Sequence, residues 1–86
     1  MTGPGSPDVR GAVLAVLARI APEADLSTLP DSADLREELD IDSIDFLNFM
    51  VGIYESLGVE VPERDYPECV TIAGCVAYLT PRTTGG

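Results

Sequence analysis

The sequence predicts an all-α protein: a small antiparallel four-helix bundle, with three main helices, a short third helix and a long loop between helices 1 and 2. Apolar residues recur at the helical period near 3.6 in three stretches, whereas strand-like alternation is confined to residues 59–61 and is closed by Pro62. Apolar residues make up 45% of the 86-residue chain, which is too many for a disordered segment and enough for one small domain.

The first helix is predicted to start at Ser6 and Pro7, a capping residue followed by a first-turn proline, and to end near Pro22. The apolar positions at the helical period are Val9, Val13, Val16, Leu17 and Ile20. Both ends of the chain are rich in Gly, Pro, Ser and Thr, so we expect flexible tails at residues 1–6 and 81–86 and a folded domain over residues 7–80.

A stretch of about twenty residues without sustained periodicity follows the first helix, which is long for a loop in a compact domain. We expect SADLREEL within it to contain a helical turn capped by Ser32 or Asp34. The leucines expected to hold the loop against the core are Leu26, Leu29, Leu35 and Leu39.

A second helix is predicted from Ser43 to Leu57, with Gly58 at its C-terminal cap. Residues placed 100° apart gather a polar stripe of Asp45, Asn48, Gly52, Glu55 and Ser56. Because apolar residues cover most of the remaining circumference, we expect this helix to be central and mostly buried, with Phe49 at the border of the two faces. The apolar residues are Ile44, Phe46, Leu47, Met50, Val51, Ile53, Tyr54 and Leu57.

The remainder of the chain predicts an extended connector at residues 59–61, then a turn or two of helix in ERDYPE, limited by Pro67. A last helix should follow with Thr71 as its cap and Pro81 as its stop. Its inward side chains are expected to be Ile72, Cys75, Val76 and Leu79.

The charge balance restricts the partners. Fifteen acidic residues against five basic ones, all Arg, give a net charge of -10, which disfavours binding to nucleic acid and to anionic membranes and favours partners with basic surfaces. No run approaches the ~20 apolar residues of a membrane span, and the N-terminus lacks the basic and apolar regions of a signal peptide. We therefore expect a cytoplasmic monomer.

The residue types also argue against several chemistries. The chain has no His, and Cys69 and Cys75 are not spaced as CxxC, so we expect no metal site and two reduced, inert thiols, with a disulfide between them as the alternative. The acids at Asp40 and Asp42 do not continue into a calcium-binding loop. Ser43 has no His or Lys to activate it as a hydrolytic nucleophile, so no catalytic residue is predicted.

The segment DSID, residues 42–45, is predicted to cap the second helix. With Asp42 at the N-cap, Asp45 occupies the third helical position, and both carboxylates lie where free amides and the helix dipole favour negative charge. Capping alone accounts for the two acids and leaves Ser43 without a role.

The longer run ELDIDSIDFLNFM resembles the signature of acyl carrier proteins, whose serine carries 4′-phosphopantetheine before a second helix. SADLREEL and VEVPERDYPECVTIAGCVAYL extend the resemblance to about residues 8–80. It implies that a phosphopantetheinyl transferase, using coenzyme A and Mg²⁺, attaches the arm to Ser43, and that the arm's thiol holds acyl groups as thioesters. The chain would then be a non-catalytic carrier, with its chemistry supplied by partners.

The same resemblance implies roles for the residues around the serine. Asp42, Asp45, Glu55 and Glu60 match acidic positions that partner enzymes recognise, and Ile44 matches a hydrophobic contact. The alternatives are a solvated acidic face for the acids and a place in the core for Ile44. The implied partners are the transferase and acyl-loading, condensing or acyl-transfer enzymes with basic docking surfaces.

Departures from the family pattern bear on the pathway. Asp40 replaces a usual Gly, Asn48 and Tyr54 occupy positions that are usually acidic in fatty-acid carriers, and Arg64 replaces a frequent acid. They favour a discrete carrier of polyketide or related natural-product biosynthesis. The alternatives are a fatty-acid-synthesis carrier, a peptidyl carrier, which DIDSID argues against, or an unmodified acidic helical adaptor whose serine only caps a helix.

Overall fold

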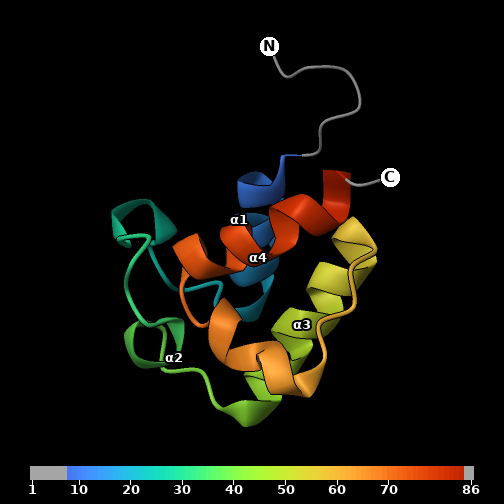
Figure 1. The fold of residues 1–86 in the computed structure, drawn as a ribbon. Helices are drawn as coiled ribbons and strands as arrows, with labels where there is room; N and C mark the ends of the chain where they lie inside the picture. The colour runs from blue at the N-terminus through green and yellow to red at the C-terminus, as the bar shows by residue number, and fades with distance from the viewer. Residues whose placement is uncertain (1–7, 85–86) are drawn as a thin grey trace.

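Four α-helices and two 3₁₀ helices make up the part of the chain that the structure, a computed structural model, describes, residues 8–84 (Figure 1). In chain order they are α1 (Val9–Ile20), η1 (Leu26–Thr28), α2 (Leu35–Glu38), α3 (Ser43–Leu57), η2 (Glu63–Cys69) and α4 (Ile72–Thr84). No strand occurs in this part, so the predicted all-α bundle is confirmed. α1 packs against both α3 and α4, and η2 packs against α4.

The first helix starts at a cap that the sequence did not single out. The Asp8 carboxylate accepts a hydrogen bond from the Gly11 amide at 3.0 Å, which satisfies one of the free amides of the first turn. Ser6 and Pro7, the predicted start, lie outside the described residues. The predicted inner face of α1 is confirmed, and Val13 and Leu17 are fully buried within it.

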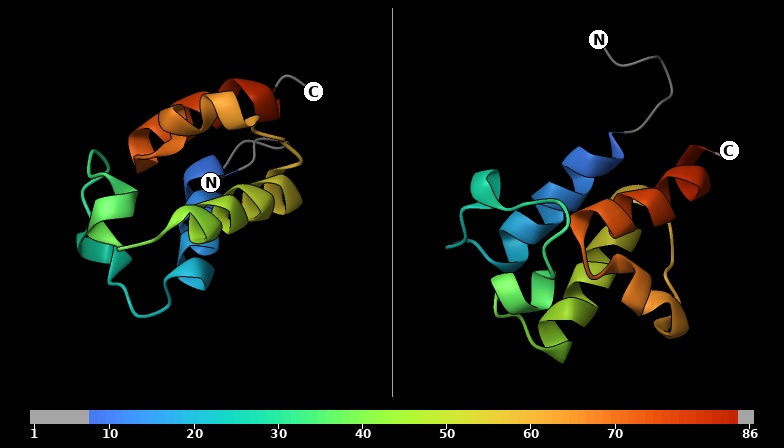
Figure 2. Two further views of the ribbon diagram at one scale, coloured as in Figure 1. Left: turned by 90° about the horizontal axis from the view of Figure 1, so that it is seen from below. Right: turned by 60° about the vertical axis from the view of Figure 1, so that its left-hand side comes forward.

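The long connection between α1 and α3 is anchored to two other segments. The Arg10 guanidinium donates two hydrogen bonds to Asp31, at 2.8 and 3.1 Å, which lower the pKa of that carboxyl. The amide of Ala73 donates to the Asp31 carbonyl at 3.0 Å, and the amide of Leu35 donates to the Val70 carbonyl at 2.7 Å. Figure 2 shows the connection gathered on one side of the bundle.

The secondary structure expected inside this connection is present. Asp34 caps α2 by accepting a hydrogen bond from the Arg36 amide at 2.9 Å, as one of the two predicted capping residues. Leu35 is fully buried, and the other three leucines pack partly buried against the core, namely Leu26, Leu29 and Leu39. The loop is therefore held by apolar contacts as well as by hydrogen bonds.

The bounds of α3 and its cap at Gly58 are confirmed, but the prediction that it is mostly buried is wrong. Its core face is a stripe at helical spacing: Phe46, Phe49, Met50, Gly52 and Ile53. Four large apolar side chains are instead exposed by 47 to 69%: Ile44, Leu47, Val51 and Tyr54.

Gly52 explains which side of α3 faces inward. A Cβ built on Gly52 would lie 2.5 Å from Cγ1 of Val16 on α1, so the two helices approach as closely as they do because residue 52 has no side chain. Gly52 was assigned to the polar stripe, whereas it marks the contact with α1. Phe49, predicted at the border, is fully buried beside it.

The segment after α3 connects the core to η2. Val59 and Val61 in the predicted connector are buried, and the following 3₁₀ helix holds Tyr66 edge-on against Phe46 of α3, with ring centroids 5.5 Å apart. Pro62 precedes this helix in an extended conformation. η2 is the short third helix that the sequence predicts.

The last helix begins as predicted and ends later. The Thr71 hydroxyl accepts a hydrogen bond from the Gly74 amide at 2.9 Å, but the helix continues through Pro81 to Thr84, so the predicted stop is wrong. A proline this near the end of a helix removes a single backbone hydrogen bond. The Arg82 guanidinium donates to the Tyr78 carbonyl at 2.7 Å and lies over the Tyr78 ring, contacts that hold the last turn together.

Both cysteines are fully buried, and neither is in a disulfide, as predicted. Cys69 ends η2, and Cys75 lies on the inner face of α4. A hydrogen bond with Cys69, together with burial, raises the pKa of the Cys75 thiol. Within residues 8–84 no helix is both long enough and apolar enough to span a membrane.

Candidate functional site

Ser43 is the first residue of α3 and is exposed to solvent. The carboxylate of Asp42 before it caps the helix by accepting a hydrogen bond from the Asp45 amide at 2.8 Å, as predicted. The capping acid therefore fixes the start of the helix while the neighbouring hydroxyl is left free of that task. Ser43 sits at the positive end of the helix dipole, where a negative group on its oxygen is stabilised.

The backbone just before the site turns through a left-handed residue. Asp40 has a φ of 53°, and within residues 8–84 no other residue except glycine has a positive φ. Asp and Asn tolerate this conformation better than other side chains do, because their short polar groups bond locally. Asp40 therefore keeps the left-handed turn that Gly would favour at this position. This turn lies between the end of α2 and the start of α3.

A groove of about 750 Å³ opens beside Ser43. It lies between the start of α3, η2 and α2, and Arg36 of α2 is the basic residue among its lining side chains. The other lining residues are Ile41, Asp42, Ile44, Phe46, Leu47, Glu63, Tyr66, Pro67 and Val70. A group attached to the Ser43 oxygen has room to extend along this groove.

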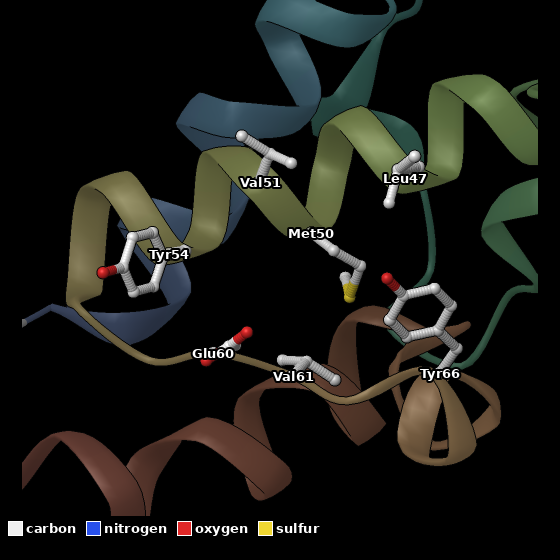
Figure 3. Close-up of a pocket in the computed structure, with 7 residues that line it drawn as sticks. All are labelled: Leu47, Met50, Val51, Tyr54, Glu60, Val61 and Tyr66. Atoms are coloured by element: carbon white, nitrogen blue, oxygen red, sulfur yellow. The ribbon is translucent and has the colours of Figure 1, made fainter.

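A second groove of about 390 Å³ lies farther along α3 (Figure 3). Met50 projects into it from α3, with Val61 and Tyr66 on the opposite side, and the Glu60 carboxylate points into the gap (Figure 3). The two grooves share Leu47 and Tyr66 as lining residues, so they adjoin. Together they form a path from Ser43 along one side of α3.

The structure places the five predicted recognition residues in four different hollows. Asp42 and Ile44 flank Ser43 at the first groove, and Ile44 is 69% exposed. Asp45 lines a different hollow, together with residues that follow α1, and Glu55 faces α1 beside Ile20 and Arg19. The fifth, Glu60, lines the second groove.

Several residues of the site were missed by sequence reasoning. Arg36 was passed over because its place in the groove that Ser43 lines depends on the turn between α2 and α3 and not on spacing within one element. Tyr66 was treated only as part of a short turn, although it lines both grooves. Leu47, Val51 and Tyr54 were assigned to the core but are exposed on α3; they form a strip with Ile44, whose exposure agrees with its prediction as a hydrophobic contact. The one available signal was Gly52, a small residue that marks the contacting face.

These features describe a small helical protein with an exposed serine at the start of its longest helix. The hydroxyl lies at a helix N-terminus and opens on a groove, and the full sequence has no His or Lys near it to act as a base.

Comparison with known proteins agrees with this class. Residues 11–79 match the family described as "Phosphopantetheine attachment site", and the chain belongs to that family. It is 31% identical to the acyl carrier protein of Renibacterium salmoninarum over 71 residues, covering 78% of this chain and 86% of that one. It is 28% identical to the acyl carrier protein of Rubrobacter xylanophilus over 60 residues, or 70% and 74% of the two chains. No solved structure gives a significant match.

The family indicates a covalently attached 4′-phosphopantetheine and a carrier that interacts with a phosphopantetheinyl transferase and with acyl-handling enzymes. The residues present fit this group. An exposed hydroxyl is available for a phosphodiester bond, the helix N-terminus and Arg36 favour an anion beside it, and the adjoining grooves have room for an extended arm. The chain is therefore an acyl carrier protein by family.

Proposed function

We propose that Ser43 is the attachment point of the arm, and that the chain carries acyl thioesters on it between partner enzymes. The observation that carries this proposal is the exposed Ser43 hydroxyl at the start of α3, beside a groove of about 750 Å³. The other exposed serines of the described residues do not line this groove: Ser27 and Ser32 precede α2, and Ser56 is at the opposite end of α3.

The attachment reaction requires little of this chain. The Ser43 oxygen forms a bond to the β-phosphorus of coenzyme A, the bond to the leaving nucleotide phosphate breaks, and the hydroxyl proton passes to the transferase or to water. The helix N-terminus favours the phosphodiester that results, whereas the neighbouring carboxylates disfavour it. A partner with basic residues offsets those carboxylates on binding, at about 1 kcal/mol or less for each exposed contact. Weak contacts of this kind allow quick release.

The proposal is tested by incubating the apo protein with coenzyme A, Mg²⁺ and a broad-specificity transferase and measuring the intact mass. One phosphopantetheinyl group should be added to the wild type and to Ser56→Ala, and none to Ser43→Ala. Ser56→Ala is a matched control, because it removes an exposed hydroxyl from the same helix. An unchanged wild-type mass would favour the unmodified adaptor, and a mass gain in Ser43→Ala would place the site elsewhere.

The second groove is where we place the end of the arm and its acyl group. Met50 lies seven residues beyond Ser43, or about 10 Å along the helix axis, and projects into the groove among Val61, Tyr66 and Glu60. The mixture of apolar and polar lining suits a short acyl group that carries polar substituents.

Met50 also supplies the test, because the chain has only two methionines and Met1 is the other. In the spectrum of methyl-labelled protein, the Met50 methyl signal should shift between the free-thiol and acylated forms, while the Met1 signal stays fixed. Identical Met50 signals in the two forms would show that the acyl group stays outside this groove.

The acidic partner face is best tested at Asp45, which is next to the site and does not line the groove. Asp45→Arg should slow modification by the transferase and leave most of the helicity intact, although a cation in the first turn weakens α3 slightly. Glu68→Arg, an equal charge change at an exposed position on η2, should have little effect. Equal rates for both variants and the wild type would refute this docking face.

For the pathway, we propose polyketide or related natural-product biosynthesis and a cytoplasmic location. The support is the reduced charge of the α3 surface, where Asn48 and Tyr54 stand at positions that are usually acidic in fatty-acid carriers. A malonyl-loading enzyme of fatty-acid synthesis should therefore load the modified wild type slowly, and the double variant Asn48→Glu, Tyr54→Glu faster. Equal loading of both would favour a fatty-acid carrier.

A further inference from the structure

We infer that Arg36 is an internal counter-ion for the phosphodiester on Ser43 and positions the base of the arm in the groove. This inference rests on the proposed attachment at Ser43 and adds a residue of this chain to that site. The inference is based on one observation: Arg36 of α2 and Ser43 of α3 line the same groove.

The other cations of the chain are placed elsewhere. The sequence contains five arginines and no lysine or histidine, and all five lie within the described residues. Arg10 is bound bidentately to Asp31, and Arg82 lies over the ring of Tyr78. Arg19 lines a hollow between α1 and α3, and Arg64 is an exposed residue of η2 that lines none of the grooves described. Arg36 is thus the cation that the fold brings to Ser43.

Arg36 is also free to change its contacts. Its one ion pair in the described structure is with Asp34 at 3.7 Å, a distance beyond a good hydrogen bond, and the Arg36 side chain is 56% exposed. An exposed pair of this kind contributes little to stability, so the guanidinium gives up little when it turns to a better partner. A phosphodiester offers two oxygens in the geometry that the planar guanidinium binds bidentately.

The charges around the groove make such a cation useful. Asp42 and Glu63 line the groove with Ser43, so an added phosphodiester places a third negative charge among them. Asp42 is held as the helix cap and cannot move away without loss of its hydrogen bond to the Asp45 amide. A cation on the α2 side compensates the new charge and directs the arm toward η2 and the second groove.

The test uses the protein before and after modification, with the added mass checked first. The side-chain Nε–H signals of the five arginines are compared by NMR in the apo and modified forms, and Arg36→Gln identifies the Arg36 signal by its loss. The Arg36 signal should shift on modification, and the Arg64 signal should not. In ~1 M salt, where charges are screened within about 3 Å, the Arg36 signal should return toward its apo position.

The phosphorus signal of the modified protein provides a second readout. It should be narrower in Arg36→Gln than in the wild type, because the phosphodiester tumbles more freely without its partner. Arg64→Gln, an equal change at an exposed site on η2, should leave the phosphorus signal as in the wild type. Circular dichroism of both variants confirms that each is folded before the signals are compared.

The outcomes separate this inference from the proposed function. A protein that gains the mass but keeps its Arg36 signal unshifted, or whose phosphorus signal responds equally to Arg36→Gln and Arg64→Gln, would overturn the role of Arg36 alone. A protein that gains no mass at Ser43 would overturn the attachment site and this inference with it.

Discussion

The division of α3 into a core face and an exposed strip predicts opposite results for two substitutions that remove equivalent atoms. Ile53 and Leu47 are isomers on the same helix; Ile53 is fully buried and Leu47 is 49% exposed. Ile53→Ala leaves a cavity in the core, with an expected loss of about 2–5 kcal/mol in the free energy of unfolding. Fully burying a leucine contributes about 1.5–3 kcal/mol, so a half-exposed one gives about 1 kcal/mol, and Leu47→Ala should lose no more than that.

Urea unfolding of the apo protein, followed by circular dichroism, measures both losses under the same conditions. If Ile53→Ala does not fold, Ile53→Val replaces it, with an expected loss of about 0.5–1.5 kcal/mol for a single methyl group. An equal or larger loss for Leu47→Ala than for Ile53→Ala would show that α3 is rotated relative to the arrangement described, and would return Leu47 to the core.

Three further predictions concern single positions. Gly52→Ala should destabilise the protein by about 1–3 kcal/mol in urea unfolding, because the new Cβ meets Val16 at 2.5 Å; a neutral effect would mean that α1 and α3 separate easily. Asp40 has a φ of 53°, which a β-branched residue disfavours and glycine accepts. The free energy of unfolding should therefore fall by about 1–3 kcal/mol in Asp40→Val and by less than about 1 kcal/mol in Asp40→Gly. Equal losses in the two variants would argue against the left-handed turn. The Tyr78 hydroxyl donates to Asp65 at 2.6 Å, and this bond, with burial, raises the pKa of Tyr78. At a pH below about 10, the pKa of an unfolded tyrosine, Tyr78→Phe should therefore lower the free energy of unfolding by about 1 kcal/mol. The difference in stability between the variant and the wild type should shrink as the pH rises through the raised pKa of Tyr78. A difference that persists at high pH would contradict this account.

The features that sequence reasoning predicted well are set by local chemistry. Asp42, Gly58 and Thr71 were each assigned as helix caps, and each occupies that place in the structure. Capping involves a side chain and an amide two or three residues away, or a glycine that can adopt a positive φ, so the signal lies within a few residues of sequence. The bounds of α3 follow from two of these caps.

The features that were missed depend on contacts between elements. Apolar residues cover most of the circumference of α3, so periodicity alone did not show which part of that surface the core would use. Gly52 and Val16 decide it, since the close approach of α1 is possible only at residue 52, but these two residues are 36 positions apart in the sequence. Pro81 shows the same limit, because contacts between Arg82 and Tyr78 hold the last turn of α4 beyond a residue that usually ends a helix.

The candidate site was predicted only in part, because some of its residues come from different elements of the fold. Ser43 and its acidic neighbours stand together in one short motif, whereas Arg36 and Tyr66 reach the groove from α2 and η2. Their place depends on the left-handed turn at Asp40 and on the ring contact between Tyr66 and Phe46. The ring contact joins residues of two different helices, so it has no signature within a single stretch of sequence.

If the acyl group occupies the second groove as proposed, the exposed strip on α3 links partner binding to access to that group. Leu47, Val51 and Tyr54 belong to the strip and also line the second groove, so any surface that covers them also covers one wall of that groove. An exposed apolar strip of this kind is uncommon on a protein that has no partner. We therefore expect an enzyme that binds along α3 to change the environment of Met50 inside the groove, and so to receive the acyl group at the place where it docks.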